Sequence, residues 1–112
     1  MFNNHASLVL QSPVLWISAE VAGGANTAIG WDTTAPSAVG SATAQALTVA
    51  SETTAPAGVS FSAPTTKASG LAMGDNLAAQ NVKAYWVRRT ATNSAAVNND
   101  GVTVQVAGDT AA

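Results

Sequence analysis

Turn-forming residues divide this chain into short segments. Clusters of Gly, Pro, Asn and Asp recur about every ten residues, and the segments between them are rich in β-branched and apolar side chains. Such spacing is typical of β-sandwiches and barrels, and helix signals are weak throughout. The pattern predicts an all-β fold with little or no helix, namely one small antiparallel β-sandwich of jelly-roll or immunoglobulin-like type.

The length of the chain is sufficient for one domain. With 112 residues it falls within the common domain size of about 100 to 150 residues. We therefore expect residues 1–112 to form a single β-sandwich domain. The polar residues 108–112 are expected to be a mobile tail or a contact arm.

The first extended segment, residues 7–21, is interrupted by Pro13. Proline lacks the amide proton that a strand ladder needs, so it marks an edge, a bulge or a break. Leu8 and Leu10 precede it on even positions, whereas Leu15 and Ile17 follow on odd ones. Because one extra residue moves side chains to the other face, this change of parity predicts a β-bulge.

Several shorter strands should follow. After a turn at residues 22–26, residues 27–32 are expected to form the hairpin partner of the first segment. A surface loop is expected over residues 33–44. Brief strands are expected where apolar side chains alternate, at Leu47 and Val49 and again at Val59 and Phe61.

The C-terminal third carries the clearest strands. Residues 82–90 are dense in β-formers, and we expect Val82, Ala84 and Trp86 to occupy the buried face of this strand. Residues 98–101, Asn-Asn-Asp-Gly, predict a type I′ hairpin turn. It would lead into a half-buried strand in which Val102, Val104 and Val106 alternate with polar or small residues.

Charged residues are scarce. They make up 9% of the chain, against about a quarter in an ordinary soluble domain. Aromatic residues are also few, at 5%, so the core should be thin and the isolated monomer only marginally stable. The predicted core anchors are Trp16, Trp31, Phe61 and Trp86, with Tyr85 beside them. Both shortages suggest that neighbouring subunits cover part of the exterior.

Several classes of partner are disfavoured. The four cations, Lys67, Lys83, Arg88 and Arg89, are too few for a nucleic-acid surface. The longest strongly apolar run, residues 14–17, is too short to span a membrane as a helix, and the first residues do not resemble a secretory signal. There is no Cys for a disulfide framework. We expect synthesis and retention in a cytosol.

No catalytic or cofactor motif is evident. His5 is the single imidazole and has no acidic neighbour in sequence, and no two carboxylates form a close pair. A zinc site would need more Cys or His ligands, and no phosphate-binding glycine loop is present. Calcium could be held at residues 98–100 or 74–76, although neither matches an EF-hand. The expectation is a protein that is not an enzyme and has no cofactor or metal.

Arg88, Arg89 and Tyr85 are the candidate subunit contacts. Adjacent strand residues project to opposite faces, so the two arginines do not form one anion clamp. In one hypothesis, one arginine pairs with an acidic loop residue of the same sheet and the other is solvated. In the other hypothesis, one arginine bridges to another subunit, for which the planar guanidinium is well suited. An exposed tryptophan that binds sugar is a further alternative.

Three stretches carry a family resemblance: residues 4–8 with 14–17, residues 52–61, and residues 84–90 continuing to Asn99-Asp100 and to residues 108–110. Together they resemble small, largely uncharacterised virion structural proteins of tailed bacteriophages. The resemblance implies a non-enzymatic protein made in the host bacterial cytoplasm and present in many copies in the virion. Its partners would be copies of itself and other virion proteins, either the major capsid protein or tail and neck proteins.

The leading hypothesis is a capsid decoration or cement protein that stabilises contacts between capsomers. A tail, neck or fibre-attachment component is the first alternative. A carbohydrate-binding β-sandwich module that uses Trp16, Trp31 or Trp86 is the second.

Overall fold

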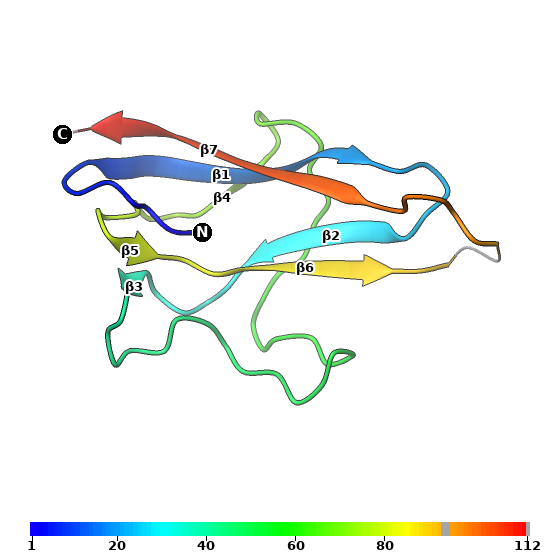
Figure 1. Cartoon of the computed structure of the whole chain (residues 1–112), viewed down its shortest axis with the longest axis horizontal. Helices are drawn as coiled ribbons and strands as arrows, with labels where there is room; N and C mark the ends of the chain where they lie inside the picture. Colours follow the sequence, from blue (N-terminus) through cyan, green and yellow to red (C-terminus); the bar gives the residue numbers. More distant parts are fainter. Residues whose placement is uncertain (93–94, 112) are drawn as a thin grey trace.

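The computed structural model describes residues 1–92 and 95–111, and these residues form seven strands and no helix (Figure 1). All strand pairings are antiparallel. The predicted all-β class is confirmed, whereas the finer prediction of a single jelly-roll or immunoglobulin-like sandwich stays a prediction. The strands are β1 (Val9–Glu20), β2 (Asn26–Trp31), β3 (Ser37–Ala38), β4 (Leu71–Ala72), β5 (Asn81–Val82), β6 (Tyr85–Thr90) and β7 (Val102–Ala111).

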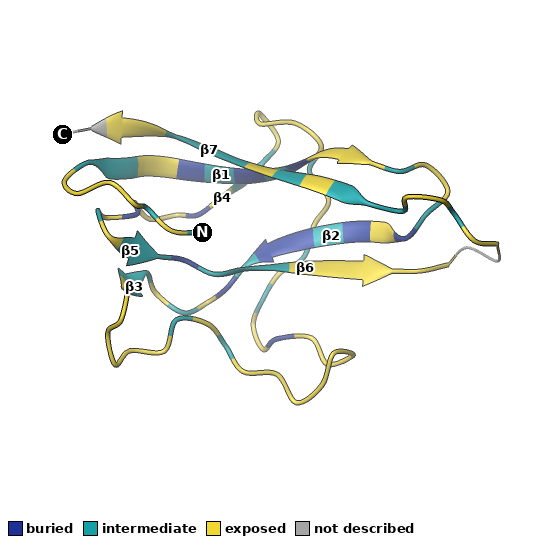
Figure 2. Ribbon diagram, in the orientation of Figure 1, coloured by how far each residue is buried: buried dark blue, intermediate teal, exposed yellow. Residues whose placement is uncertain are grey.

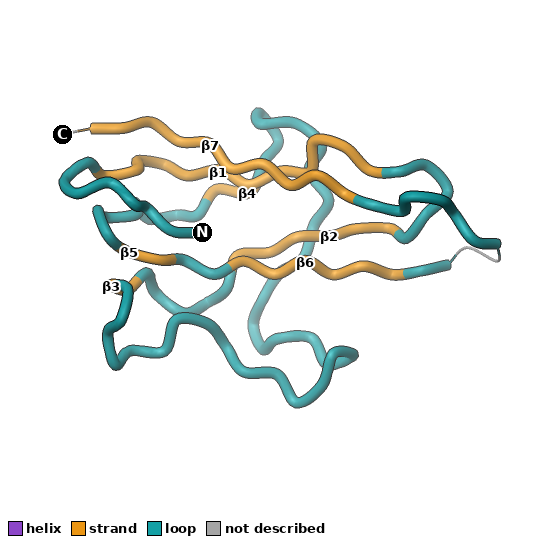
Figure 3. The backbone as a smooth tube through the Cα atoms, in the orientation of Figure 1, coloured by secondary structure: helices purple, strands orange, loops and turns teal. Residues whose placement is uncertain are grey.

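The strands are arranged in three small sheets, in the orders β4-β1-β7, β2-β6 and β3-β5. Between them run long irregular segments, most of all over residues 39–70 (Figure 3). The brief strands expected at residues 46–51 and around Val59 and Phe61 are therefore wrong. Only Ser62 makes an isolated β-bridge there, with Ile29. Two prolines and two glycines within residues 53–70 keep the backbone from forming a longer ladder.

β1 is the central strand, and it carries the predicted bulge. Its pairing with β7 shifts register between Gln11 and Val14 and again between Ile17 and Ala19. Ser12 adopts a φ of 48° and donates its backbone N–H to the side-chain oxygen of Asn76 at 3.0 Å. The parity change across Pro13 was therefore a correct signal of local irregularity.

The other edge of β1 is covered by short pieces of chain. Leu10 exchanges two backbone hydrogen bonds with Leu77, and Pro13 accepts one from the N–H of Met73. β4 pairs at Val14 and Leu15, and the N–H of Ile17 donates to Pro64 at 2.8 Å. Both edges of β1 are thus occupied.

The expected hairpin between the first two segments is wrong. β2 pairs with β6, from Asn26 opposite Thr90 to Trp31 opposite Tyr85. The turn before β2 exists, with Gly23 at a φ of 77°, but β7 and the short pieces already fill the edges of β1. β2 therefore passes to the second sheet and packs across the core from β1 (Figure 1).

The expected hairpin at residues 98–101 is also wrong, because β6 and β7 belong to different sheets. In that segment the positive φ, 54°, belongs to Asn99 and not to Asp100 or Gly101. The polar residues 108–111 are not a tail: they continue β7 and pair with the start of β1, where Gln11 lies opposite Asp109. Residue 112 lies outside the described residues.

The strand expected over residues 82–90 is broken at Lys83 and Ala84 into β5 and β6. Its orientation also differs from the expected one, since Tyr85 packs against the core cluster and Trp86 lies on the opposite face. The break allows Lys83 to bury its side chain, which is 6% exposed. Its ammonium group donates to the backbone oxygen of Thr34 at 2.6 Å.

The core lies between the three-stranded sheet and the β2-β6 pair. Leu15, Ile17 and Ile29 form its fully enclosed centre, and β1 and β2 supply all three (Figure 2). The side chains that surround them are only partly buried: Trp31, Leu71, Tyr85, Val102, Val104 and Val106. The apolar centre is therefore thin, as the few aromatic residues predicted.

Candidate interaction surface

One side of the molecule is closed by backbone hydrogen bonds, whereas on the opposite side no strand of the described residues bridges the two sheets. On the closed side, Ile29 of β2 exchanges two hydrogen bonds with Ser62, and Ile17 of β1 bonds to Pro64. Residues 62–64 thus connect the two sheets. On the opposite side, β6 pairs only with β2 and β7 only with β1 among the strands of the described residues. We call this side, bounded by the edges of β6 and β7, the open side.

Burial follows the same asymmetry. The core residues next to the closed side are at most 4% exposed, whereas Val102, Val104 and Val106 of β7 are only partly buried. On β6, Val87 is 43% exposed. Apolar side chains that face the interior therefore remain accessible between the two strand edges.

At one end of the open side, Arg89 links β6 to β2 and to the segment that precedes β7. Its guanidinium group donates to Thr27, to the backbone oxygens of Ala25 and Asp100, and to the carboxylate of Asp100 at 2.6 Å. Asp100 also accepts the N–H of Ala25 at 3.0 Å. A side chain on Gly24 would collide with that carboxylate, so a larger residue at this position would displace the side chain of Asp100.

The pKa of Asp100 is lowered from its ordinary value. The largest cause is the hydrogen bond from the backbone of Ala25, followed by the hydrogen bond and the charge of Arg89. The carboxylate therefore stays ionised to a lower pH than a free aspartate, and the ion pair persists over that range. Of the two arrangements considered for the arginines, Arg89 adopts the pairing with an acidic loop residue.

Asp32 anchors the long loop that follows β2. Its side chain is 2% exposed and accepts hydrogen bonds from the backbone of Thr34 at 2.7 Å, from the backbone of Leu47 at 2.9 Å and from the indole of Trp86 at 2.6 Å. Burial alone would raise the pKa of this carboxyl group. The hydrogen bonds from Leu47, Thr34 and Trp86 together outweigh burial and lower the pKa.

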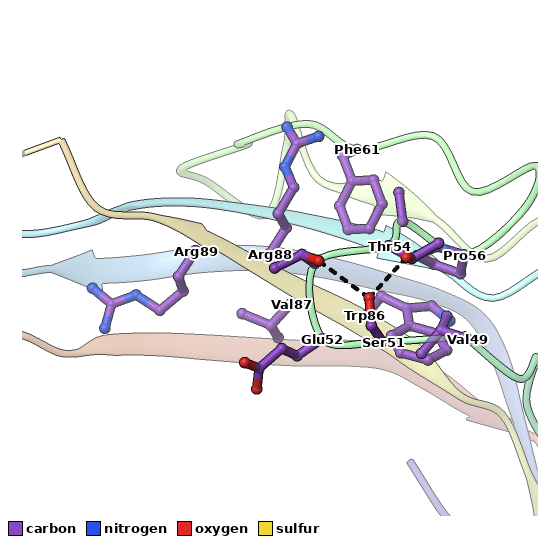
Figure 4. A pocket seen from close by; sticks show the side chains of 12 residues that line it. Val49, Ser51, Glu52, Thr54, Pro56, Phe61, Trp86, Val87, Arg88 and Arg89 are labelled. Carbon is purple, nitrogen blue, oxygen red and sulfur yellow. Dashed lines mark hydrogen bonds between the residues drawn. The ribbon is translucent and has the colours of Figure 1, made fainter.

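A groove of about 230 Å³ lies along the outer face of β6, between that strand and the loop of residues 49–56. Its floor includes Trp86 and Phe61, and Arg88 places its guanidinium group 4.7 Å from the centre of the Phe61 ring. Figure 4 shows Arg88 directed toward Phe61 and Arg89 directed away from it. No ion pair of Arg88 occurs within residues 1–92 and 95–111.

The three candidate contact residues therefore lie on one strand but in different surroundings. Arg88 lines the groove, Arg89 is engaged with Asp100, and Tyr85 faces the core. Tyr85 packs edge-on against Trp31, with ring centres 6.1 Å apart. β6 brings them together only as neighbours along the chain.

The four candidate core anchors are all partly exposed. Trp31 packs against the core cluster and donates its indole N–H to the backbone oxygen of Leu71 at 2.9 Å. Trp86 and Phe61 line the groove, and Trp16 lies in β1 opposite Gln105. The fully enclosed centre is aliphatic instead.

Two features of this surface were missed by sequence reasoning. Asp32 was expected only as the last residue of a strand and Asp100 only as a turn residue, because the backbone donors that hold the two carboxylates, Leu47 and Ala25, lie far away in sequence. The edge of β7 left a readable signal, since residues 102–108 contain no charge and no proline. The alternation of this segment predicts a half-buried strand, but it does not predict which strands pair with it.

Comparison with known proteins finds no matching family model, no matching curated protein and no matching solved structure. Within the described residues, no group of three or more His, Cys, Asp or Glu side chains could hold a metal ion. The same residues contain no helix long and apolar enough to cross a membrane.

Proposed function

We propose that this chain is a non-enzymatic structural subunit of a bacteriophage virion, and that it acts as a capsid decoration or cement protein. The resemblance, carried by residues 4–8 and 14–17, by 52–61, and by 84–90 with 99–100 and 108–110, supports the phage assignment. The open side supports the assembly role, and it is the observation on which the proposal depends. Half-buried valines and two unpaired strand edges are features that a neighbouring subunit would cover.

The size of the exposed surface supports the same role. The accessible area is 6577 Å², whereas a compact monomer of 11.1 kDa exposes about 5,700 Å². The radius of gyration is 15.3 Å, against about 13 Å for a compact domain of this length. This chain exposes more surface than its length requires, and contact with other subunits would remove it.

A cement protein works by adding contact area across the joints between larger subunits. Here the added area would come from the edges of β6 and β7 and from the groove, where the guanidinium group of Arg88 lies over the ring of Phe61. Edge strands supply backbone hydrogen bonds, and a desolvated arginine on an aromatic ring supplies a specific polar contact. Each contact raises the free energy needed to separate the subunits.

The test is to look for this chain in purified particles of the phage that encodes it. Quantitative mass spectrometry should find it in a copy number comparable to that of the major capsid protein. Particles of a phage mutant that lacks the gene should release their DNA at a lower temperature than particles of the parent phage. Absence of the chain from purified particles would end the proposal.

Copy number also separates this role from the tail, neck or fibre alternative, because such components are present in far fewer copies than capsid proteins. The carbohydrate-binding alternative gains no support from two of its three tryptophans. The indole N–H groups of Trp31 and Trp86 are both donated to groups of the protein itself.

A further inference from the structure

β7 is a long edge strand without the usual protection. Monomeric proteins guard such edges with charges, prolines or bulges, because an unpaired edge recruits other strands. Between Val102 and Gly108 the strand contains no charged residue and no proline. Both register shifts with β1 place the extra residue on β1, so β7 itself continues regularly from Val102 to Ala111.

The hydrogen bonds between β1 and β7 show which residues of β7 direct their backbone groups away from β1. Gly101 accepts the N–H of Val21, and the backbone oxygen of Thr103 accepts a bond from Ser18 at 3.4 Å. The odd-numbered residues therefore direct their backbone groups toward β1. By the alternation of an antiparallel ladder, the even-numbered residues from Val102 to Thr110 direct theirs outward.

We propose that β7 pairs with β7 of a second copy of this chain, antiparallel and about a two-fold axis, so that two three-stranded sheets become one sheet of six. Val106 is the outward-directed residue nearest the middle of the strand and would lie on the axis. This inference refines the proposed assembly role by naming the partner and the register.

Two observations fit a second copy of this chain as the partner. In this register Thr103 faces the partner's Asp109, so no like charges oppose each other along the edge. The surface in excess of a compact monomer is about 900 Å² per chain, which is close to the roughly 800 Å² that each partner contributes to a standard interface.

The symmetry also accounts for the exposed residues of β6. A two-fold axis normal to the extended sheet keeps both β2-β6 layers on the same side of it. The β6 edges of the two copies would then face each other across the axis, and Val87, exposed in one chain, would be covered by the other. Pairing at β7 thus shields the half-buried valines of the open side.

The register is tested with a charge pair at one position. Thr103→Lys would face the partner's Asp109 in both halves of the dimer and tighten it, whereas Thr103→Glu would oppose like charges and loosen it. The dissociation constants of the two variants should differ by roughly tenfold, since such cross-strand pairs favour opposite charges and disfavour like ones. Sedimentation equilibrium of the full chain measures both.

Thr48→Lys and Thr48→Glu, on an exposed loop, are the matched controls and should leave the constant unchanged. Circular dichroism checks that all four variants fold. A wild-type chain that stays monomeric at the highest attainable concentration overturns the inference. So does a dimer that responds equally to both Thr103 variants, because its interface would lie elsewhere.

Failure here is separable from failure of the proposed function. A dimer that obeys the charge test but is absent from virions keeps this inference and removes the phage role. A chain found in virions that never pairs through β7 does the reverse.

Discussion

Asp32 shows how one side chain organises a segment that has almost no secondary structure. The loop after β2 has a two-residue strand and otherwise no ladder to hold it. Three N–H groups, from Thr34, Leu47 and Trp86, converge on the carboxylate, and Lys83 holds the backbone oxygen of Thr34. The path of residues 33–47 therefore depends on a buried anion.

Replacing Asp32 by Asn tests this dependence. An amide would present one oxygen and an NH₂ group to donors that need acceptors, so buried N–H groups would lose their partner. We expect Asp32→Asn to lower the free energy of unfolding by about 2–3 kcal/mol. Urea unfolding followed by tryptophan fluorescence measures it. Asp75→Asn, at an exposed position, is the control, and equal losses in both variants would contradict the role of Asp32.

The Arg89 ion pair makes a prediction about a single pKa. In the wild-type chain, the hydrogen bond and the positive charge of Arg89 both lower the pKa of Asp100. Arg89→Gln removes them both. The pKa of Asp100 should therefore rise. Arg88→Gln changes the neighbouring residue, which lies on the opposite face of β6, and should leave the pKa of Asp100 unchanged. Carboxyl-carbon NMR titration distinguishes the two variants, and an equal response in both would refute the assignment.

The two lowered pKa values also fix how stability depends on pH. The pKa values of Asp32 and Asp100 lie below the ordinary value of 3.8 in the folded chain. The unfolded state therefore takes up protons first as the pH falls, and both groups stabilise the fold above the unfolded value. Stability should be level near neutral pH and decline from about pH 4 downward. Unfolding that grows easier between pH 7 and pH 5 would point to another group.

Among the strands, the degree to which sequence predicts structure depends on whether the signal is local. Pro13 and the parity change of the leucines correctly predicted the irregularity in β1, because a bulge is a property of one strand. The alternating valines correctly predicted a strand beginning at Val102. Strand pairing is not a local property. β2 pairs with β6 because β7 occupies one edge of β1 and short segments occupy the other. The pattern of either strand alone could not reveal this.

The candidate surface follows the same division. Arg88 and Arg89 stand out in a chain with so few charges, and both proved to have specific partners, Phe61 and Asp100. The acceptor for Arg89 could not be predicted, because Asp100 belongs to a segment that reads as a hairpin turn. The continuation of β7 through residues 108–111 was hidden by their polar character, since those residues pair with β1 through the backbone.

Gly30 determines how closely the irregular chain can cover β2. A Cβ at this position would lie 2.5 Å from the backbone oxygen of Ser60 and 2.7 Å from Val59. Gly30→Ala should therefore push residues 59–60 off the strand and destabilise the fold by about 1–3 kcal/mol. Thermal unfolding provides the measurement. Gly101→Ala, where the nearest atom would be 3.4 Å away, should cost much less, and equal costs would exclude a steric cause.

The molecule as a whole is extended and thin. Its principal dimensions are 49 × 32 × 21 Å, and its enclosed centre consists of three aliphatic side chains. Few charges keep the surface from repelling another copy of itself, while the open side leaves valines in contact with water. Both properties favour association of the folded chain with another copy over the isolated folded monomer.

Association of this kind makes thermal stability depend on concentration. A partner that binds only the folded chain raises its melting temperature by mass action. For a dimer of this size we expect Tm to rise by about 3–6 °C for each tenfold increase in concentration, measured by differential scanning calorimetry over a roughly hundredfold range.

The Thr103→Glu chain supplies the internal reference for this measurement. With the pairing weakened, its Tm should approach that of the dissociated chain and lose most of its dependence on concentration, while Thr48→Glu keeps the wild-type slope. A wild-type Tm that is constant across the concentration range would mean that the monomer does not associate and is stable without a partner. The half-buried valines of β7 would then be an ordinary exposed edge, and the excess surface would need a different explanation.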